Sequence, residues 1–168
     1  MSEVVREVMT KPRIQIIRGL PGAGKSTLAM SRYPNLMRIE TDMFFYRNGE
    51  YKFTLENNKK AVKWFKEQIL ICSKQGMDFV LTGVFSAHTE RLGNAVSIAL
   101  DNGYEVYIKT LTKNYGSIHG VPQNHLDAMK ESFLPERELK KMYKNEVNVH
   151  FGLMPKHYPL EHKRKKIK

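Results

Sequence analysis

The amino-acid sequence predicts an α/β fold in three αβα layers, with helices on both faces of a parallel sheet. Short β-branched or apolar runs alternate with longer segments of helical periodicity along most of the chain, as in consecutive βαβ units. A glycine-rich loop joins the first such run to the first helix. The 168 residues amount to one domain, since domains typically run ~100–200 residues. No internal repeat or linker interrupts the pattern.

The elements of the first half follow from local residue patterns. Arg13–Arg18 is rich in β-branched residues and ends at Gly19, as a buried strand does. In 56–74 the apolar positions recur every three or four residues, which is the helical period. Between them, the aromatic-rich segment 41–54 contains the turn signal Arg47-Asn48-Gly49-Glu50. The elements expected here are strands at 13–18 and 37–40 and helices at 25–31 and 56–74.

The second half continues the alternation. The apolar run 79–81 predicts a strand, and 104–110 alternates as a strand does. Pro122 suits the first turn of a helix. The helices expected are 89–101, 122–133 and 135–145. Because periodicity fades from Gly152 on, we expect a domain over residues 12–150 and a basic tail over 151–168.

Composition excludes several classes of protein. Leu, Ile, Val and Phe number 43, about a quarter of the chain and above the ~20% typical of disorder. One cysteine cannot form an intramolecular disulfide, which fits a reducing compartment. No apolar run approaches the ~20 residues of a membrane span, and Met1–Lys11 has no signal-peptide core. We expect a soluble, cytoplasmic protein with no membrane partner, and its oligomeric state stays open.

The charge suggests a partner. Lys and Arg number 28 against 17 acids, a net charge of +11, and the pI is near 9.7. A pI above ~9 is one feature of nucleic-acid-binding proteins. The last residues, Lys163–Lys168, are almost all basic. This tail is either an electrostatic arm for a phosphate backbone or a solubilising segment, and we expect DNA or RNA as the partner.

The segment Gly19–Ser26 reads Gly-Leu-Pro-Gly-Ala-Gly-Lys-Ser, which matches the phosphate-binding pattern G-x-x-x-x-G-K-[ST]. Glycines let the backbone N–H groups point inward at a phosphate, and the following helix aims its positive end at the same anion. Lys25 would reach the β- and γ-phosphates, and Ser26 would supply a hydroxyl to Mg²⁺. We therefore expect ATP and Mg²⁺ as cofactors. The predicted binding residues are Gly22, Ala23, Gly24, Lys25, Ser26 and Thr27.

A candidate base follows the second strand. Glu40-Thr41-Asp42 ends that strand, and ligands of open α/β sheets bind at the carboxyl ends of strands. Asp42 is placed to accept a proton from an attacking hydroxyl or to hold Mg²⁺ through water; a cap or turn role is the alternative. Arg47 is either a contact for a substrate phosphate or a solvated turn residue. The aromatic residues at 44–46 either stack on bases or belong to the core.

Four segments, taken together, resemble the P-loop polynucleotide-kinase-like family. That family includes the kinase domain of phage 5′-kinase/3′-phosphatase and many stand-alone, AAA-type phage ATPases. The resemblance implies a P-loop NTPase kinase-type fold with a helical lid and transfer of the ATP γ-phosphate to a hydroxyl, often the 5′-OH of DNA or RNA. It implies Lys25 and Asp42 as catalytic residues and His119 near the nucleotide. The segments are Arg18–Ala29, Thr41–Phe45, Asn48–Tyr51 and Ile118–Pro122.

The sequence departs from the family pattern at three places. Met43 stands where members often have a second acid, and Thr82–Ser86 replaces an Asp-Asn-Thr-Asn run. Gly116-Ser117 stands where many members carry Arg-Asn. A cation at the transferring phosphoryl group is worth roughly 10³–10⁵ in rate, so another residue would have to replace this arginine. The candidates are Lys109, Lys113 and Arg91.

These departures leave three functions open. A polynucleotide 5′-hydroxyl kinase is the first, because of the resemblance and the net charge of +11. A small-molecule, nucleoside-type kinase is the second, and such an enzyme has no need of that charge. A non-catalytic ATP-binding or partner-inhibiting protein is the third, favoured by the missing arginine and acids.

Overall fold

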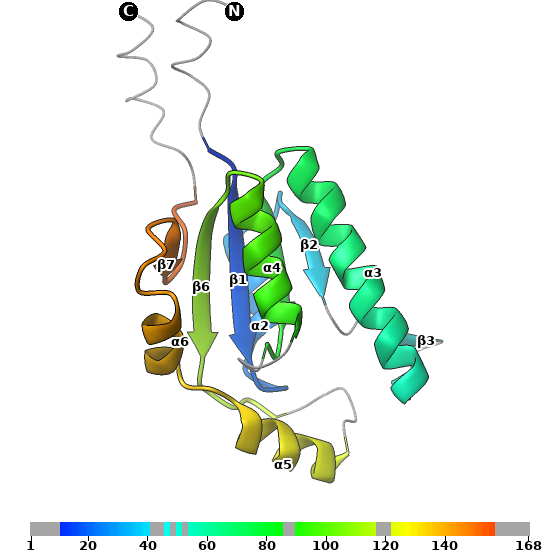
Figure 1. Cartoon of the computed structure of the whole chain (residues 1–168). Coiled ribbons are helices and arrows are strands. Elements are labelled where there is room, and N and C mark those ends of the chain that lie inside the picture. Colours follow the sequence, from blue (N-terminus) through cyan, green and yellow to red (C-terminus); the bar gives the residue numbers. More distant parts are fainter. Residues whose placement is uncertain are drawn as a thin grey trace, which may run out of the picture.

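A computed structural model describes residues 11–40, 46–47, 50–51, 54–85, 90–116 and 122–156, with only the backbone at 46–47, 50–51 and 90. Within these residues, one parallel sheet has the strand order β2-β5-β1-β6-β7 (Figure 1). Because β1 is central, the loop that follows it lies in the middle of the carboxyl edge of the sheet. The strands are β1 (Arg13–Gly19), β2 (Met37–Glu40), β5 (Phe79–Gly83), β6 (Glu105–Leu111) and β7 (Val149–Phe151).

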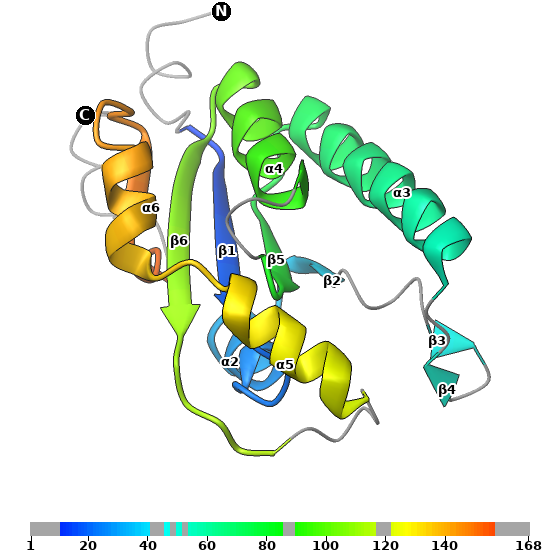
Figure 2. The same cartoon turned by 60° about the horizontal axis from the view of Figure 1, so that its bottom comes forward.

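Helices cover both faces of this sheet, so the predicted three-layer α/β fold is confirmed (Figures 1 and 2). A small antiparallel hairpin agrees with the turn signal of this region and pairs Tyr46 with Tyr51 and Arg47 with Glu50. Its strands are β3 (Tyr46–Arg47) and β4 (Glu50–Tyr51). The helices are α2 (Lys25–Arg32), α3 (Leu55–Lys74), α4 (Glu90–Asp101), α5 (Gln123–Ser132) and α6 (Glu136–Met142). None of these helices is long and apolar enough to cross a membrane.

The alternation of side chains along β1 divides the core in two. Ile14 and Ile16 are fully buried beneath α3, α4 and α6, in a cluster that includes Phe65, Ile69, Leu92 and Leu139. Ile17 points to the opposite face and packs with Ala29 and Tyr33 beside α2. Burial on both faces explains why the isoleucines of β1 do not alternate strictly with exposed polar residues in the sequence.

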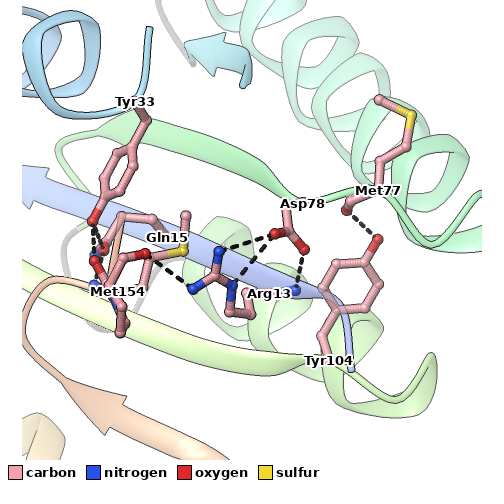
Figure 3. A network of polar contacts seen from close by, with 8 residues as sticks. Arg13, Gln15, Tyr33, Met77, Asp78, Tyr104 and Met154 are labelled. Atoms are coloured by element: carbon pink, nitrogen blue, oxygen red, sulfur yellow. Dashed lines mark hydrogen bonds and ion pairs between the residues drawn. The ribbon is translucent and has the colours of Figure 1, made fainter. Parts of the chain in front are cut away.

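Polar contacts fix the C-terminal segment to the amino end of β1 (Figure 3). The Arg13 guanidinium donates to Asp78 Oδ2 (3.2 and 3.3 Å) and to the Pro155 carbonyl (3.0 Å). Gln15 Oε1 accepts from the Met154 backbone N–H (2.7 Å) and from the Tyr33 hydroxyl (2.9 Å). The chain therefore reaches Pro155 at the edge of the sheet opposite to the loop after β1.

The end of the packed region differs from the expected domain boundary. The boundary at residue 150 falls inside β7, which pairs with β6, and Met154 is fully buried. The sequence pattern did not predict β7, because three residues are too few to display a period. The strands β1, β2, β5 and β6 and the five helices lie within a few residues of their predicted bounds.

Candidate active site

The loop between β1 and α2 adopts a conformation that its glycines allow. Gly22 and Gly24 have φ angles of +85° and +89°, a region that side-chain-bearing residues rarely adopt. Gly22 is also crowded, since a Cβ on it would lie 2.8 Å from the carbonyl group of Gly116. The loop therefore needs glycine at position 22 for two independent reasons, its backbone angle and its close neighbour.

The segment after β6, residues 114–116, packs against this loop. The Tyr115 N–H donates to the Gly22 carbonyl (2.7 Å), and the Gly116 N–H donates to Asn114 Oδ1 (2.8 Å). Gly24 faces the ring of Tyr115, which is 71% exposed. An exposed aromatic ring therefore stands beside the N-terminus of α2, and nothing in the local sequence pattern had indicated this.

Lys25 folds back onto its own loop. Its Nζ donates to the carbonyls of Gly19 (2.8 Å) and Leu20 (3.0 Å). These acceptors are neutral carbonyls. A phosphate bound in the loop would replace them as the acceptor of Lys25, because a charged acceptor makes the stronger hydrogen bond. The geometry is that of a cation positioned for an anion in the loop.

Ser26 contacts a carboxylate that the sequence analysis did not assign to the site. Its Oγ donates to Glu40 Oε1 at 2.5 Å, and Glu40 is the last residue of β2. Arg38 Nε lies 3.1 Å from the same carboxylate oxygen. Glu40 and Ser26 are 14 residues apart, so only the parallel arrangement of β1 and β2 brings them together.

The described residues offer few ligands for a metal ion. They contain no group of three or more His, Cys, Asp or Glu side chains that would hold one. Mg²⁺ does not need such a group, because it usually takes one or two protein ligands and completes its shell with substrate phosphates and water. The Ser26 hydroxyl beside Glu40 fits this mode of binding.

Arg18, the residue before the loop, is fully buried. It donates to the Phe85 carbonyl (3.1 Å), the Thr110 hydroxyl (3.1 Å) and the Leu134 carbonyl (2.6 Å). Its guanidinium also lies 4.1 Å from the centre of the Phe133 ring. Burial lowers the pKa of Arg18 to about 10, which still leaves the group charged at neutral pH. Arg18 thus joins β1 to β6 and to the segments that follow β5 and α5.

A cavity of about 670 Å³ lies between the loop, the end of β6 and α5. Figure 2 shows α5 crossing the carboxyl edge of the sheet beside α2. Lys113 lines the cavity from the β6 side and Lys130 lines it from α5. The other lining residues include Leu20, Pro21, Leu126, Asp127 and Phe133.

The structure brings the predicted loop residues together and leaves other predictions untested. Asp42 and His119 lie outside the described residues, and so does the side chain of Arg47. Thr27 is exposed on the first turn of α2.

The three cations considered as replacements for the missing arginine lie in different surroundings. Arg91 donates to Asn58 Oδ1 (2.7 Å) between α4 and α3, and Lys109 stands on β6 opposite Ile17. Lys113 lines the cavity beside the loop.

Two curated proteins show sequence similarity to the chain. Human NEDD4-binding protein 2 is 36% identical over 69 residues, which are 38% of this chain and 4% of that protein. An uncharacterized protein of Pasteurella multocida (strain Pm70) is 26% identical over 122 residues, covering 63% of this chain and 68% of that one. The chain therefore corresponds to a small part of the human protein. No protein-family model matches it.

Solved structures show the same fold. A gluconokinase from Sinorhizobium meliloti 1021 is similar with a TM-score of 0.51 and 14% identity, over 95% of this chain and 91% of that one. A chain of the Pnkp1/Rnl/Hen1 RNA repair complex has a TM-score of 0.51 and 16% identity, over 95% of this chain and 44% of that one. The fold is that of P-loop kinases.

Proposed function

We propose that the protein is an ATP-dependent phosphotransferase that moves the γ-phosphate to a hydroxyl, with the 5′-OH end of DNA or RNA as the acceptor. The observation that carries the proposal is the loop Gly19–Ser26 itself. Its two left-handed glycines, the retracted ammonium of Lys25 and the hydroxyl of Ser26 lie at the carboxyl edge of a P-loop kinase fold.

Each group of the loop has one task in this proposal. The Lys25 ammonium exchanges the carbonyls of Gly19 and Leu20 for β- and γ-phosphate oxygens, which stabilises the charge that develops on the transferred group. Ser26 is the residue of the loop that would hold Mg²⁺. The metal ion, when bound, would neutralise phosphate charge and align the γ-phosphate for attack.

Two further groups complete the proposed site. Asp42 follows β2 by two residues, and by its resemblance to the polynucleotide-kinase-like family it would accept the proton of the attacking hydroxyl. Lys113 and Lys130 line the cavity beside the loop. Either ammonium would supply the positive charge that the missing lid arginine supplies in the family.

The charge of α3 supports a nucleic acid as the acceptor. Lys59, Lys63 and Lys66 are exposed, and their spacing of four and three residues places them on one face of the helix. Glu56 pairs with Lys60 on a neighbouring strip (3.5 Å). Asn58 is bonded to Arg91 in the first turn of α4, the helix that follows β5. This row of lysines therefore begins at the carboxyl edge of the sheet, where the acceptor would bind.

The test is a panel of acceptors with γ-labelled ATP: 5′-OH DNA and RNA oligonucleotides, nucleosides, small polyols and water alone. Label on the oligonucleotides supports the proposal, and label only on nucleosides or polyols would make the protein a small-molecule kinase. No label on any acceptor, with ATP still bound, would leave a non-catalytic ATP-binding protein. Asp42→Asn should reduce transfer by roughly 10²–10⁴-fold and leave ATP affinity nearly unchanged.

A further inference from the structure

We propose that Glu40 is a positioning residue for the magnesium ion. It would take the role of an acid at the end of β5, where this chain has none. The inference rests on the proposed function, because it requires ATP in the loop. Its carrying observation is the 2.5 Å contact between Ser26 Oγ and Glu40 Oε1, which joins the loop to β2 rather than to β5.

The contact determines which way the serine hydroxyl points. A hydroxyl group has one proton and two acceptor lone pairs, and an ionised carboxylate only accepts. The Ser26 proton is therefore directed at Glu40, and the lone pairs of Oγ are directed elsewhere. A hydroxyl oriented in this way presents its lone pairs to a cation while its proton stays satisfied.

The neighbouring strand explains why an acid is needed on β2. Glu40 stands beside Thr82 in the parallel pairing of β2 with β5, and β5 ends in Thr82 and Gly83. Neither residue carries a charge that could balance a divalent cation near Ser26. Glu40 brings that charge to the same edge of the sheet, one strand further from the loop.

The surroundings of Glu40 fix its carboxylate. Its side chain is only 22% exposed, and Arg38 Nε lies 3.1 Å from Oε1. The hydrogen bond from Ser26 and the charge of the neighbouring Arg38 favour one orientation of the carboxylate, which is what an outer-shell partner of a metal ion requires. Loss of such partners typically reduces metal affinity about 10–100-fold.

The test separates the charge of Glu40 from its hydrogen bond. Glu40→Gln retains an oxygen that accepts from Ser26 but removes the negative charge, and Glu67→Gln makes the same charge change at an exposed site on α3. Calorimetry gives the dissociation constant of ATP with EDTA and with Mg²⁺ for each protein. The ratio of the two constants is the tightening due to magnesium.

The ratio of the ATP dissociation constants with EDTA and with Mg²⁺ should be the same in wild type and Glu67→Gln. Glu40→Gln should lower this ratio roughly 10–100-fold. The dissociation constant of ATP with EDTA should be unchanged or smaller in Glu40→Gln. Electron paramagnetic resonance of Mn²⁺ should show a matching rise in free metal. Glu40→Asp, which keeps the charge, should recover part of the ratio.

An unchanged ratio and unchanged Mn²⁺ binding in Glu40→Gln would overturn the role of Glu40 and leave the proposed function standing. The absence of ATP binding in the wild type would instead overturn the proposed function. The unfolding temperature of Glu40→Gln without ligand checks that the variant is folded when its ratio is compared with that of the wild type.

Discussion

The guanidinium of Arg18 donates to the carbonyl of Leu134 across 2.6 Å, and this bond joins the residue before the phosphate loop to the chain just after α5. Arg18 also lies against the Phe133 ring, and Phe133 is one of the residues that line the cavity beside α5. Arg18 therefore links the start of the phosphate loop to the segment that follows α5 through buried contacts.

Arg18→Met should destabilise the protein, although the two side chains have similar volumes. The variant leaves the carbonyls of Phe85 and Leu134 and the Thr110 hydroxyl without their donor, and a buried unsatisfied acceptor costs about 1–3 kcal/mol. We expect a loss of at least about 2 kcal/mol in the free energy of unfolding, measured with urea. Arg137→Met, at a side chain that is 78% exposed, is the control and should change little. Equal effects of the two substitutions would show that the buried contacts of Arg18 contribute nothing.

Lys25→Ala should remove the response of the protein to ATP. A ligand that binds the folded state stabilises it by about 2.7 kcal/mol at 100 times its dissociation constant, and the ammonium that reaches the phosphates is lost in the variant. The measurement is the unfolding temperature with and without Mg·ATP at matched concentrations. Lys59→Ala, an exposed lysine of α3, should behave as wild type. The same ATP-induced stabilisation in Lys25→Ala would place the nucleotide elsewhere.

The two basic regions should contribute separately to nucleic-acid binding. The logarithm of affinity should fall linearly with the logarithm of salt, at a slope of about −0.7 per contacted phosphate of a single strand. Replacing Lys59, Lys63 and Lys66 by Gln should make the slope shallower by roughly one unit or more if two of them touch phosphates. Truncation after Glu161 should do the same if the final basic run, 163–168, touches phosphates.

Neither change should alter ATP binding. Pro155 is bonded to Arg13 at the amino end of β1, opposite to the phosphate loop, and the α3 lysines lie on the outer face of their helix. Replacing Lys140, Lys141 and Lys144 of the α6 region by Gln is the matched control, because two of these lysines pair with acids of their own helix. Identical slopes in all four proteins would remove both regions from the interface.

Tyr33 should make stability sensitive to alkaline pH. Burial raises the pKa of its hydroxyl above the ordinary value of 10.0, and Arg32 opposes this in part. The folded protein therefore holds the phenolic proton more tightly than the unfolded chain, and the free energy of unfolding falls as pH rises above 10.0.

Tyr33→Phe removes both the proton and the bonds to Gln15 and Met154 (2.9 and 2.8 Å). It should cost about 1 kcal/mol at neutral pH, and this difference from wild type should shrink in urea unfolding above pH about 10. Tyr115→Phe, at an exposed ring, should show no such trend. If the difference in the free energy of unfolding between wild type and Tyr33→Phe stays constant with pH, the pKa of Tyr33 does not change on folding.

The sequence predicted most of the fold because its strands bury both faces. β1 is rich in isoleucine, β5 begins with an apolar run, and α3 shows its buried face through Phe65, Ile69 and Cys72. The phosphate loop was predictable because its glycines, lysine and serine are contiguous. β7 was not, since Val149–Phe151 is short and half-buried.

Contacts between distant residues could not be derived from local patterns. Glu40 reaches Ser26 only because β2 and β1 run parallel with β5 between them. Arg18 looks like any charged residue at the end of a strand, yet it is fully buried by groups from three other parts of the chain. Its burial depends on acceptors 67 to 116 residues away.

We propose that this site transfers the γ-phosphate of ATP to the 5′-hydroxyl of a nucleic acid. The most direct measurement uses γ-labelled ATP, Mg²⁺ and two oligonucleotides of one sequence, the first with a free 5′-OH and the second with a 5′-phosphate. We expect label on the first oligonucleotide alone, removable by a phosphatase, and no label with Lys25→Ala. Equal label on both oligonucleotides, or none on either while ATP binds, would contradict it.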